Sequence, residues 1–352
     1  MHIKIVQKLQ PFSHRPGTYV ILPGSPYRLR VFPARLEVDD LSSATPKPIA
    51  AIDLDIKGIV DEFTVMQDLE RGLVRVHGRG VNGYFRYGVS ARVGGKVALN
   101  VEKFPQPIPD CAFNDHFEFV EGTERIPTDH MSRLSLGNHR AQDWELMSRK
   151  GDLTAIFPIW HRLGQFYSAL PIHFEGTAFL LNECRQAIEA NTPEHTLRAF
   201  YALFLVGFEG ALSPRLWDTH FHGIALPEVE KPQELSPLVL LQRGGELIQS
   251  LFIQEKEGAI DLLPAVPPEF HCGRLVNVAV QNGKIDLEWT KKAIRRVVFT
   301  AEITGCLVLR FSNHEKSCRL RLSDKDPGSL YVPGSSLDVV AGQTYWFDHF
   351  QC

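Results

Sequence analysis

Two polar stretches of the chain hold acidic, amide, histidine and aromatic side chains close together in sequence. The first covers residues 138–145 and contains Asn138, His139, Asp143, Trp144 and Glu145. Planar hydrogen-bonding groups beside an aromatic ring are what a binding site uses for a small polar ligand such as a sugar. The same composition is typical of a capped helix start with one solvated face. The sequence leaves both interpretations open.

The second stretch covers residues 208–223 and contains Glu209, Trp217, Asp218, His220 and His222. The two histidines are two positions apart, so on a strand both would point to the same face. With Asp218 they could bind a metal ion, but no H-E-x-x-H motif accompanies them. We therefore expect a polar or catalytic pocket or a structural cluster here, and we predict no metal site and no cofactor.

The elements before these stretches are predicted to be strands. Residues 72–102 alternate apolar and polar side chains with a period of two, and Asn82-Gly83 is a two-residue hairpin signal. Further short strands are expected at residues 19–22, 27–32 and 49–56. Together they predict an N-terminal β-sandwich over residues 1–108. The proline-rich segment 104–110 is a candidate boundary, because residues before proline favour extended backbone.

A helical block is predicted over residues 109–257, and it contains both polar stretches. Helical composition or apolar spacing of three and four residues marks the segments 143–150, 156–170, 177–190, 196–208 and 238–252. Thr192-Pro193-Glu194 is a strong helix start. At the usual helix length of about 11–12 residues, the block has room for roughly five to seven helices.

Residues 258–352 are predicted to form a C-terminal β-domain. Strands are expected at residues 275–280, 284–289, 295–301 and 306–311, with a hairpin turn at Asn282-Gly283. The predicted fold is therefore a multi-domain α and β protein, in which an N-terminal β-sandwich, a shortened helical block and a C-terminal β-domain follow one another.

One segment carries a more specific signal. Residues 246–289 include Ile248-Gln249-Ser250, the run Leu262-Leu263-Pro264-Ala265-Val266-Pro267, Gly273 and Asp286-Leu287-Glu288-Trp289. This segment resembles the junction between the last catalytic-barrel helix and the C-terminal β-domain of family 95 glycoside hydrolases, the inverting α-L-fucosidases. The resemblance implies a β-sandwich, an α/α-barrel and a β-domain in that order, so the helical block would correspond to part of such a barrel.

The resemblance also implies an activity, namely hydrolysis of a glycosidic bond. Inverting glycosidases use an acid and a base carboxylate that lie about 6.5–9.5 Å apart. The candidate catalytic residues are Asp143, Glu145, Glu209 and Asp218. The candidate substrate-binding residues are Asn138, His139, Trp144, Trp217, His220 and His222.

A non-catalytic function is the alternative hypothesis. The family has an acidic residue shortly before the last barrel helix, and residues 236–240 of this chain contain no carboxylate. The chain would then be a carbohydrate-binding or protein-interaction module that kept the scaffold without the active site.

Composition limits the partners and the location that we expect. The chain has 352 residues, 38 of them basic and 41 acidic, and the net charge of −3 gives no reason to expect a nucleic acid as partner. No apolar run approaches about 18 residues and no signal peptide is recognisable. Six cysteines occur without a C-x-x-C pair. These features predict a cytoplasmic protein with no membrane partner.

Overall fold

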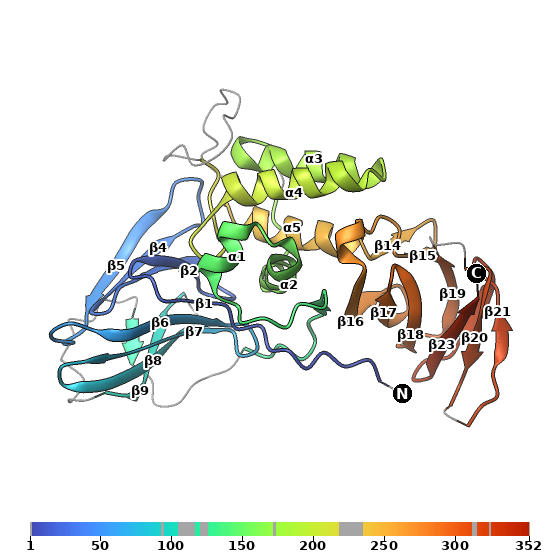
Figure 1. Ribbon diagram of the computed structural model, residues 1–352, viewed down its shortest axis with the longest axis horizontal. Helices are drawn as coiled ribbons and strands as arrows, with labels where there is room; N and C mark the ends of the chain where they lie inside the picture. The colour runs from blue at the N-terminus through green and yellow to red at the C-terminus, as the bar shows by residue number, and fades with distance from the viewer. Residues whose placement is uncertain are drawn as a thin grey trace.

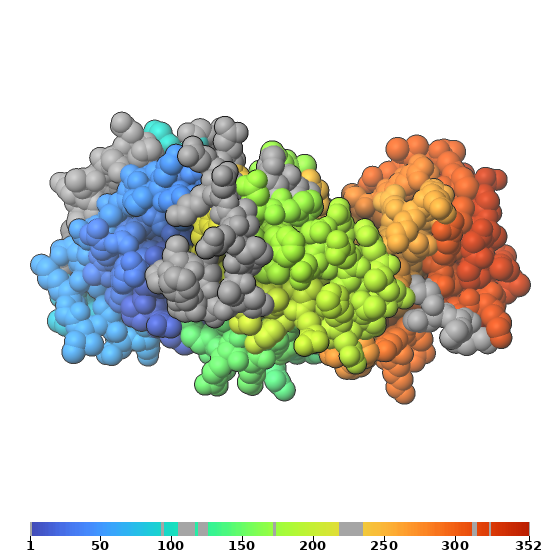
Figure 2. All heavy atoms as spheres, turned by 90° about the horizontal axis from the view of Figure 1, so that it is seen from above, coloured from blue at the N-terminus to red at the C-terminus, as the bar shows by residue number. Residues whose placement is uncertain are grey.

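The computed structural model describes residues 2–92, 95–104, 117–119, 126–171, 174–217, 235–311, 315–323 and 325–351. This part of the chain is mostly β-sheet, with five α-helices between the N-terminal and the C-terminal strands. Figures 1 and 2 show these three groups of elements in that order along the long axis of the molecule.

Two sheets contain most of the N-terminal strands. One has the strand order β1 (Phe12–Ser13), β6 (Asp61–Asp68), β7 (Leu73–Gly80), β8 (Gly83–Ala91), β9 (Val97–Lys103) and β10 (Phe117–Phe119). The other has the order β2 (Thr18–Ile21), β3 (Tyr27–Val31), β4 (Arg35–Asp40) and β5 (Lys47–Asp53).

The predicted alternation and turn in the first sheet are confirmed. Strands β7 and β8 form a hairpin around Asn82, in which Gly80 pairs with Gly83. Val74 and Val76 of β7 are fully buried, whereas Arg75 between them is partly exposed. The two sheets contact each other through Gln67 of β6, whose buried side-chain amide donates to the Ile21 carbonyl of β2 at 2.7 Å.

Five α-helices form the middle of the described chain, close to the five predicted segments. They are α1 (Trp144–Lys150), α2 (Leu153–Gly164), α3 (Phe179–Glu189), α4 (Pro193–Gly207) and α5 (Val239–Ser250), with a short 3₁₀ turn η1 at Gly176–Ala178. Helix α2 begins three residues before the predicted segment, because Asp152 caps it. Thr192 and Pro193 begin α4 as predicted, although the Thr192 side chain makes no capping hydrogen bond.

Helices α2 and α5 pack closely because glycines leave space between them. A Cβ atom on Gly244 of α5 would lie 2.5 Å from the Trp160 ring of α2, and one on Gly164 would lie 2.5 Å from the Leu241 carbonyl oxygen. The Trp160 indole N–H donates to the Leu240 carbonyl at 3.1 Å. The Gly244-Gly245 pair weakens the intrinsic helix propensity of α5, but it lets the indole ring lie directly against the backbone.

Most of the remaining strands form two sheets toward the C-terminus. The seven-stranded sheet has the order β11 (Arg133–Ser135), β16 (Cys272–Val280), β17 (Gly283–Thr290), β18 (Ala293–Ala301), β23 (Thr344–Gln351), β20 (Ser317–Arg321) and β21 (Ser329–Tyr331). The four-stranded sheet has the order β14 (Ile253–Lys256), β15 (Ala259–Leu262), β19 (Gly305–Phe311) and β22 (Ser336–Val339). The short strands β12 (Phe208–Glu209) and β13 (Ser213–Pro214) pair with each other after α4.

The four predicted C-terminal strands are present as β16 to β19, and the predicted hairpin at Asn282-Gly283 joins β16 to β17. Strand β11 was not expected from the sequence. It lies just before the helices in the chain, yet it pairs with β16 at the edge of the seven-stranded sheet. The sheet therefore includes residues that are more than a hundred positions apart.

The proline-containing run after β15 lies between α5 and the seven-stranded sheet. The Leu263 amide donates to the Phe252 carbonyl at 2.7 Å, and the Phe252 ring stacks on Trp289 of β17 at 4.9 Å. The Trp289 indole donates to the Phe270 carbonyl of the 3₁₀ turn η2 (Pro268–Phe270) at 2.8 Å. The Phe270 ring lies 5.2 Å from Phe157 of α2. These aromatic rings connect the helices to the sheet.

Across the described ranges, no helix is long and apolar enough to span a membrane. The cysteines whose side chains are described, Cys184, Cys272, Cys306 and Cys318, are free thiols.

Candidate functional site

The first polar stretch forms the loop between β11 and α1 and the start of α1. The Asn138 amide donates to the Asp152 carboxylate at 3.3 Å and its carbonyl oxygen accepts from the Arg140 backbone N–H at 3.0 Å. Asp143 is the N-cap of α1, where its carboxylate accepts from the Leu146 backbone N–H at 3.1 Å. This is the capped helix start that the composition of the stretch also allowed.

The junction between α1 and α2 holds the other end of this loop. Gly151 ends α1 in the left-handed region with a φ of 58°, a conformation that glycine adopts without a Cβ clash. Asp152 follows as the N-cap of α2. One oxygen of its carboxylate accepts from the Thr154 backbone N–H at 3.1 Å and from the Thr154 hydroxyl at 2.5 Å. Asn138 binds the other oxygen, and the loop is thereby fixed to the helix junction.

The N-terminal residues 2–11 form an extended arm that passes beside this loop. The Gln142 side chain binds the arm backbone at two points, because it accepts from the Gln10 N–H at 2.7 Å and donates to the Lys8 carbonyl at 3.0 Å. Arg133 donates to the Gln7 carbonyl at 2.7 Å, and Arg274 of β16 donates to the Lys4 carbonyl at 3.1 Å. The arm therefore contacts both the loop before α1 and the seven-stranded sheet.

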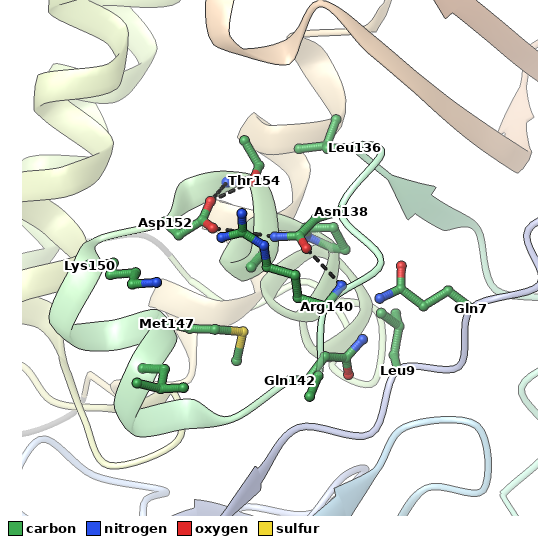
Figure 3. A pocket seen from close by; sticks show the side chains of 14 residues that line it. Gln7, Leu9, Leu136, Asn138, Arg140, Gln142, Met147, Lys150, Asp152 and Thr154 are labelled. Atoms are coloured by element: carbon green, nitrogen blue, oxygen red, sulfur yellow. Dashed lines mark hydrogen bonds between the residues drawn. The ribbon is translucent and has the colours of Figure 1, made fainter.

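A cavity of about 170 Å³ lies between the arm, the loop and the helix junction, and we call it the arm cavity. Figure 3 shows how the loop, α1 and the arm surround it. Its lining residues are Gln7, Leu9, Leu136, Asn138, Arg140, Ala141, Gln142, Leu146, Met147, Lys150, Asp152, Thr154, Ala155 and Pro158.

The lining of the arm cavity combines amide, hydroxyl and charged groups with apolar side chains. Gln7, Asn138 and Thr154 offer hydrogen-bonding groups, and Leu136 and Met147 form part of the apolar wall. The cavity is smaller than the roughly 300–1,000 Å³ that is usual for drug-sized ligands. It is suited to one small molecule that has both polar groups and an apolar face.

Two of the predicted site residues in the first stretch serve the packing of α1. Trp144 is 4% exposed, and its ring meets Phe204 of α4 edge-on at 6.2 Å. The indole therefore lies in the core and is not a platform for a ligand. Glu145 accepts a hydrogen bond from the Ser13 hydroxyl of β1 at 2.5 Å. His139 is exposed and does not line the arm cavity.

Glu209, a predicted catalytic residue of the second stretch, lies in a different place. Its carboxylate pairs with the Arg28 guanidinium of β3 at 2.5 Å, and Arg28 also binds Asp39 of β4 at 2.7 Å. The Arg28 guanidinium carbon lies 4.2 Å from the centre of the Tyr19 ring. None of these four residues lines the arm cavity.

The rest of the second stretch is described only in part. Trp217 is partly buried and packs against the hydrophobic core. Asp218, His220 and His222 lie outside the described residues. Within the ranges that the structure describes, no group of three or more His, Cys, Asp or Glu side chains is arranged to hold a metal ion.

A serine and a histidine are hydrogen-bonded in the core between α2 and β11. The Ser132 hydroxyl lies 2.8 Å from His161 Nε2, and His161 Nδ1 lies 3.2 Å from the Gly245 carbonyl oxygen of α5. With Nδ1 protonated, that nitrogen donates to the carbonyl and Nε2 accepts from the serine hydroxyl. His161 is 1% exposed, and burial lowers its pKa to about 4. This neutral, inaccessible pair joins three elements and has no space for a substrate.

Arg162, next to this pair, is also buried. Its guanidinium donates to the carbonyls of Ser132 at 3.3 Å and Thr128 at 3.1 Å. Burial lowers the pKa of Arg162 to about 10, so the side chain stays charged near neutral pH. Its partners are backbone carbonyl dipoles, which fix the segment before β11 against α2.

Of the residues predicted to bind a substrate, Asn138 lines the arm cavity. The sequence interpretation missed Gln7, Lys150, Asp152 and Thr154. The Asp152 cap could have been found from its place just before an apolar helical segment. No local signal identifies Gln7, because its position beside the loop depends on how the arm packs.

Comparison with known proteins adds no assignment. No protein-family model matches the chain, and no curated protein matches it significantly.

Proposed function

We propose that the chain is a small relative of the family 95 glycoside hydrolases that binds a carbohydrate in the arm cavity without cleaving it. The observation that carries this proposal is the lining of the cavity, in which Asn138, Gln7 and Thr154 lie among apolar side chains. Sugars have hydroxyl groups that amides bind from both sides, as donor and as acceptor. Their C–H faces pack against apolar side chains such as Met147.

The arrangement of the carboxylates supports binding over hydrolysis. A glycosidase needs two carboxyl groups on either side of the bond to be cleaved, at about 5–9.5 Å from each other. Among the described residues, Asp152 is the one acidic residue that lines the arm cavity. Asp143 caps a helix, Glu145 binds Ser13 and Glu209 pairs with Arg28. Each predicted catalytic carboxylate in the described part therefore has a structural partner.

The resemblance supports a sugar as the ligand. The run from Leu262 to Pro267 follows α5 and precedes the strands β16 and β17, which agrees with its place at the junction in the family. We extend the proposal to the layout of the chain: a β-sandwich over residues 1–108, a helical block over 109–257 that corresponds to part of an α/α-barrel, and a β-domain over 258–352.

A glycan array tests the proposal directly. The purified chain would be applied to immobilised neutral and acidic oligosaccharides. The variant Ala141→Trp would fill the cavity from an exposed position without removing a hydrogen bond. The matched control is Ala190→Trp, a similar change at an exposed position at the end of α3.

Binding by the wild-type chain and the control, with loss of binding in Ala141→Trp, is the expected result. Failure of every sugar to bind would contradict the proposal and leave a protein-interaction module as the alternative. Release of the aryl group from aryl glycosides by the purified chain would contradict the proposal that the protein binds a sugar without cleaving it.

A further inference from the structure

More positive than negative side chains line the arm cavity. Arg140 and Lys150 bring two positive charges, and Asp152 brings one negative charge. The chain as a whole has a net charge of −3. A local excess of positive charge on a chain of negative net charge raises the concentration of anions at that place.

The single carboxylate is occupied within the protein. One Asp152 oxygen accepts from the backbone N–H and the hydroxyl of Thr154, and the other accepts from the Asn138 amide. These donors are neutral, and they hold the start of α2 and the loop. Asp152 therefore acts as a cap and a loop anchor, and its lone pairs are largely used before any ligand arrives.

The two cations, by contrast, have no acidic partner among the residues that the structure describes. Neither Arg140 nor Lys150 takes part in any of the ion pairs found in the described part of the chain. Both side chains are exposed. The backbone of Arg140 is fixed by the hydrogen bond from its N–H to Asn138, so the base of the side chain is held in place. Figure 3 shows the two side chains from the loop and from the end of α1 beside the same cavity.

From this arrangement we propose that the arm cavity takes an acidic sugar, a ring that carries a carboxylate. Arg140 offers a planar fork of donors that fits a carboxylate with two parallel hydrogen bonds, and Lys150 adds a second positive charge. Asn138 and Gln7 then bind the ring hydroxyls. The inference rests on the proposed function and adds the charge of the ligand.

The test compares acidic and neutral sugars that differ in one group. Isothermal titration calorimetry would measure the binding of glucuronate and glucose, galacturonate and galactose, and mannuronate and mannose to the full chain. Glucose 6-sulfate would show whether the anion must be a carboxylate. The variants are Arg140→Gln and Lys150→Gln. Arg149→Gln is the matched control, because Arg149 is an exposed cation of α1 that does not line the cavity.

At least one uronate should bind about tenfold more tightly than its neutral partner, since charge-assisted bonds to a carboxylate are about twice as strong as neutral ones. That preference should weaken in both variants and with added salt, and it should persist in Arg149→Gln. Equal binding within all three uronate and neutral-sugar pairs would overturn the inference and leave carbohydrate binding intact. Tighter binding of glucose 6-sulfate than of glucuronate would overturn the inference that the anionic group is a carboxylate. Absence of binding by all of these sugars would count against the inference and the proposed function together.

Discussion

The Glu209 carboxylate and the Arg28 guanidinium form an ion pair between residues 181 positions apart in the chain. Glu209 follows α4, and Arg28 lies in β3 of the four-stranded N-terminal sheet. Nearby, the Ala211 backbone N–H donates to the Tyr19 carbonyl at 2.8 Å. A residue whose type suggested catalysis thus joins the end of the helical segment to the N-terminal sheet.

Replacing this carboxylate should therefore reduce stability. Glu209→Gln keeps the size of the side chain but leaves Arg28, which is 7% exposed, with Asp39 as its one acidic partner within the described residues. The glutamine amide oxygen can still accept from Arg28, so the variant loses the charge and not the whole bond. Because charge-assisted hydrogen bonds are about twice as strong as neutral ones, we expect the free energy of unfolding in urea to fall by about 1–1.5 kcal/mol.

Glu189→Gln is the control for this prediction. Glu189 pairs with Arg185 at 3.9 Å on the surface of α3, where its side chain is 65% exposed. Exposed pairs of this kind contribute about 0.3–0.5 kcal/mol. Equal losses of stability in the two variants would show that the Glu209 pair is no more important than a surface pair.

The two neighbouring glycines of α5 should respond differently to alanine. A Cβ atom on Gly244 would lie 2.5 Å from the buried Trp160 ring, whereas the nearest atom to one on Gly245 would be 3.4 Å away. Overpacking of a core costs about 1–3 kcal/mol, and alanine gains up to about 1 kcal/mol in helix propensity. We expect Gly244→Ala to lower the thermal midpoint and Gly245→Ala to leave it unchanged or raise it. A stabilised Gly244→Ala variant would mean that α2 and α5 are less closely packed than described.

His161 should make the fold sensitive to mild acid. Its pKa is about 4 in the folded chain, against an ordinary value of 6.5 in the unfolded chain. Because the unfolded chain binds the proton more readily, the full stability is present above about pH 6.5 and falls as the pH is lowered toward 4. The loss from this group reaches roughly 3 kcal/mol at pH 4.

The free energy of unfolding in urea, measured between pH 7 and pH 5, would check this effect. This pH range lies above the one in which most carboxylates titrate, so their contribution to the change is small. His161→Gln removes the titrating group, so its free energy of unfolding should depend less steeply on pH than that of the wild type, whatever its absolute stability. His195→Gln, at an exposed position of α4, should keep the wild-type dependence. An unchanged slope in His161→Gln would refute the role of this histidine.

The Gln142 side chain should hold the N-terminal arm against the loop. Gln142→Ala removes the acceptor for the Gln10 N–H and the donor to the Lys8 carbonyl. A net loss of about 1 kcal/mol corresponds to roughly five- to tenfold faster exchange of the Gln10 amide hydrogen. Hydrogen–deuterium exchange with peptide mass spectrometry would measure it, with Gln186→Ala on the exposed face of α3 as control. Unchanged protection of the arm would show that Arg133 and Arg274 hold it without Gln142.

Local features of the fold could be read from the sequence. The hairpins at Asn82-Gly83 and Asn282-Gly283 were predicted because these residues adopt the turn conformation that short hairpins require. The helix starts at Asp143 and Pro193 follow from the chemistry of helix caps. In each case neighbouring residues determine the structure, so the chain carries the information locally.

The tertiary structure decided which residues meet. The spacing of residues in the sequence indicates which face of its helix a side chain occupies. It does not indicate which residues of other elements pack against that face. Trp144 therefore lies in the core against Phe204, Glu209 pairs with Arg28, and β11 joins the C-terminal sheet. The arm cavity depends on the same long-range packing, because Gln7 and Asp152 come together only when the arm lies beside the helix junction. Contacts of this kind are stabilised by the burial of distant surfaces against each other, and no local pattern specifies them.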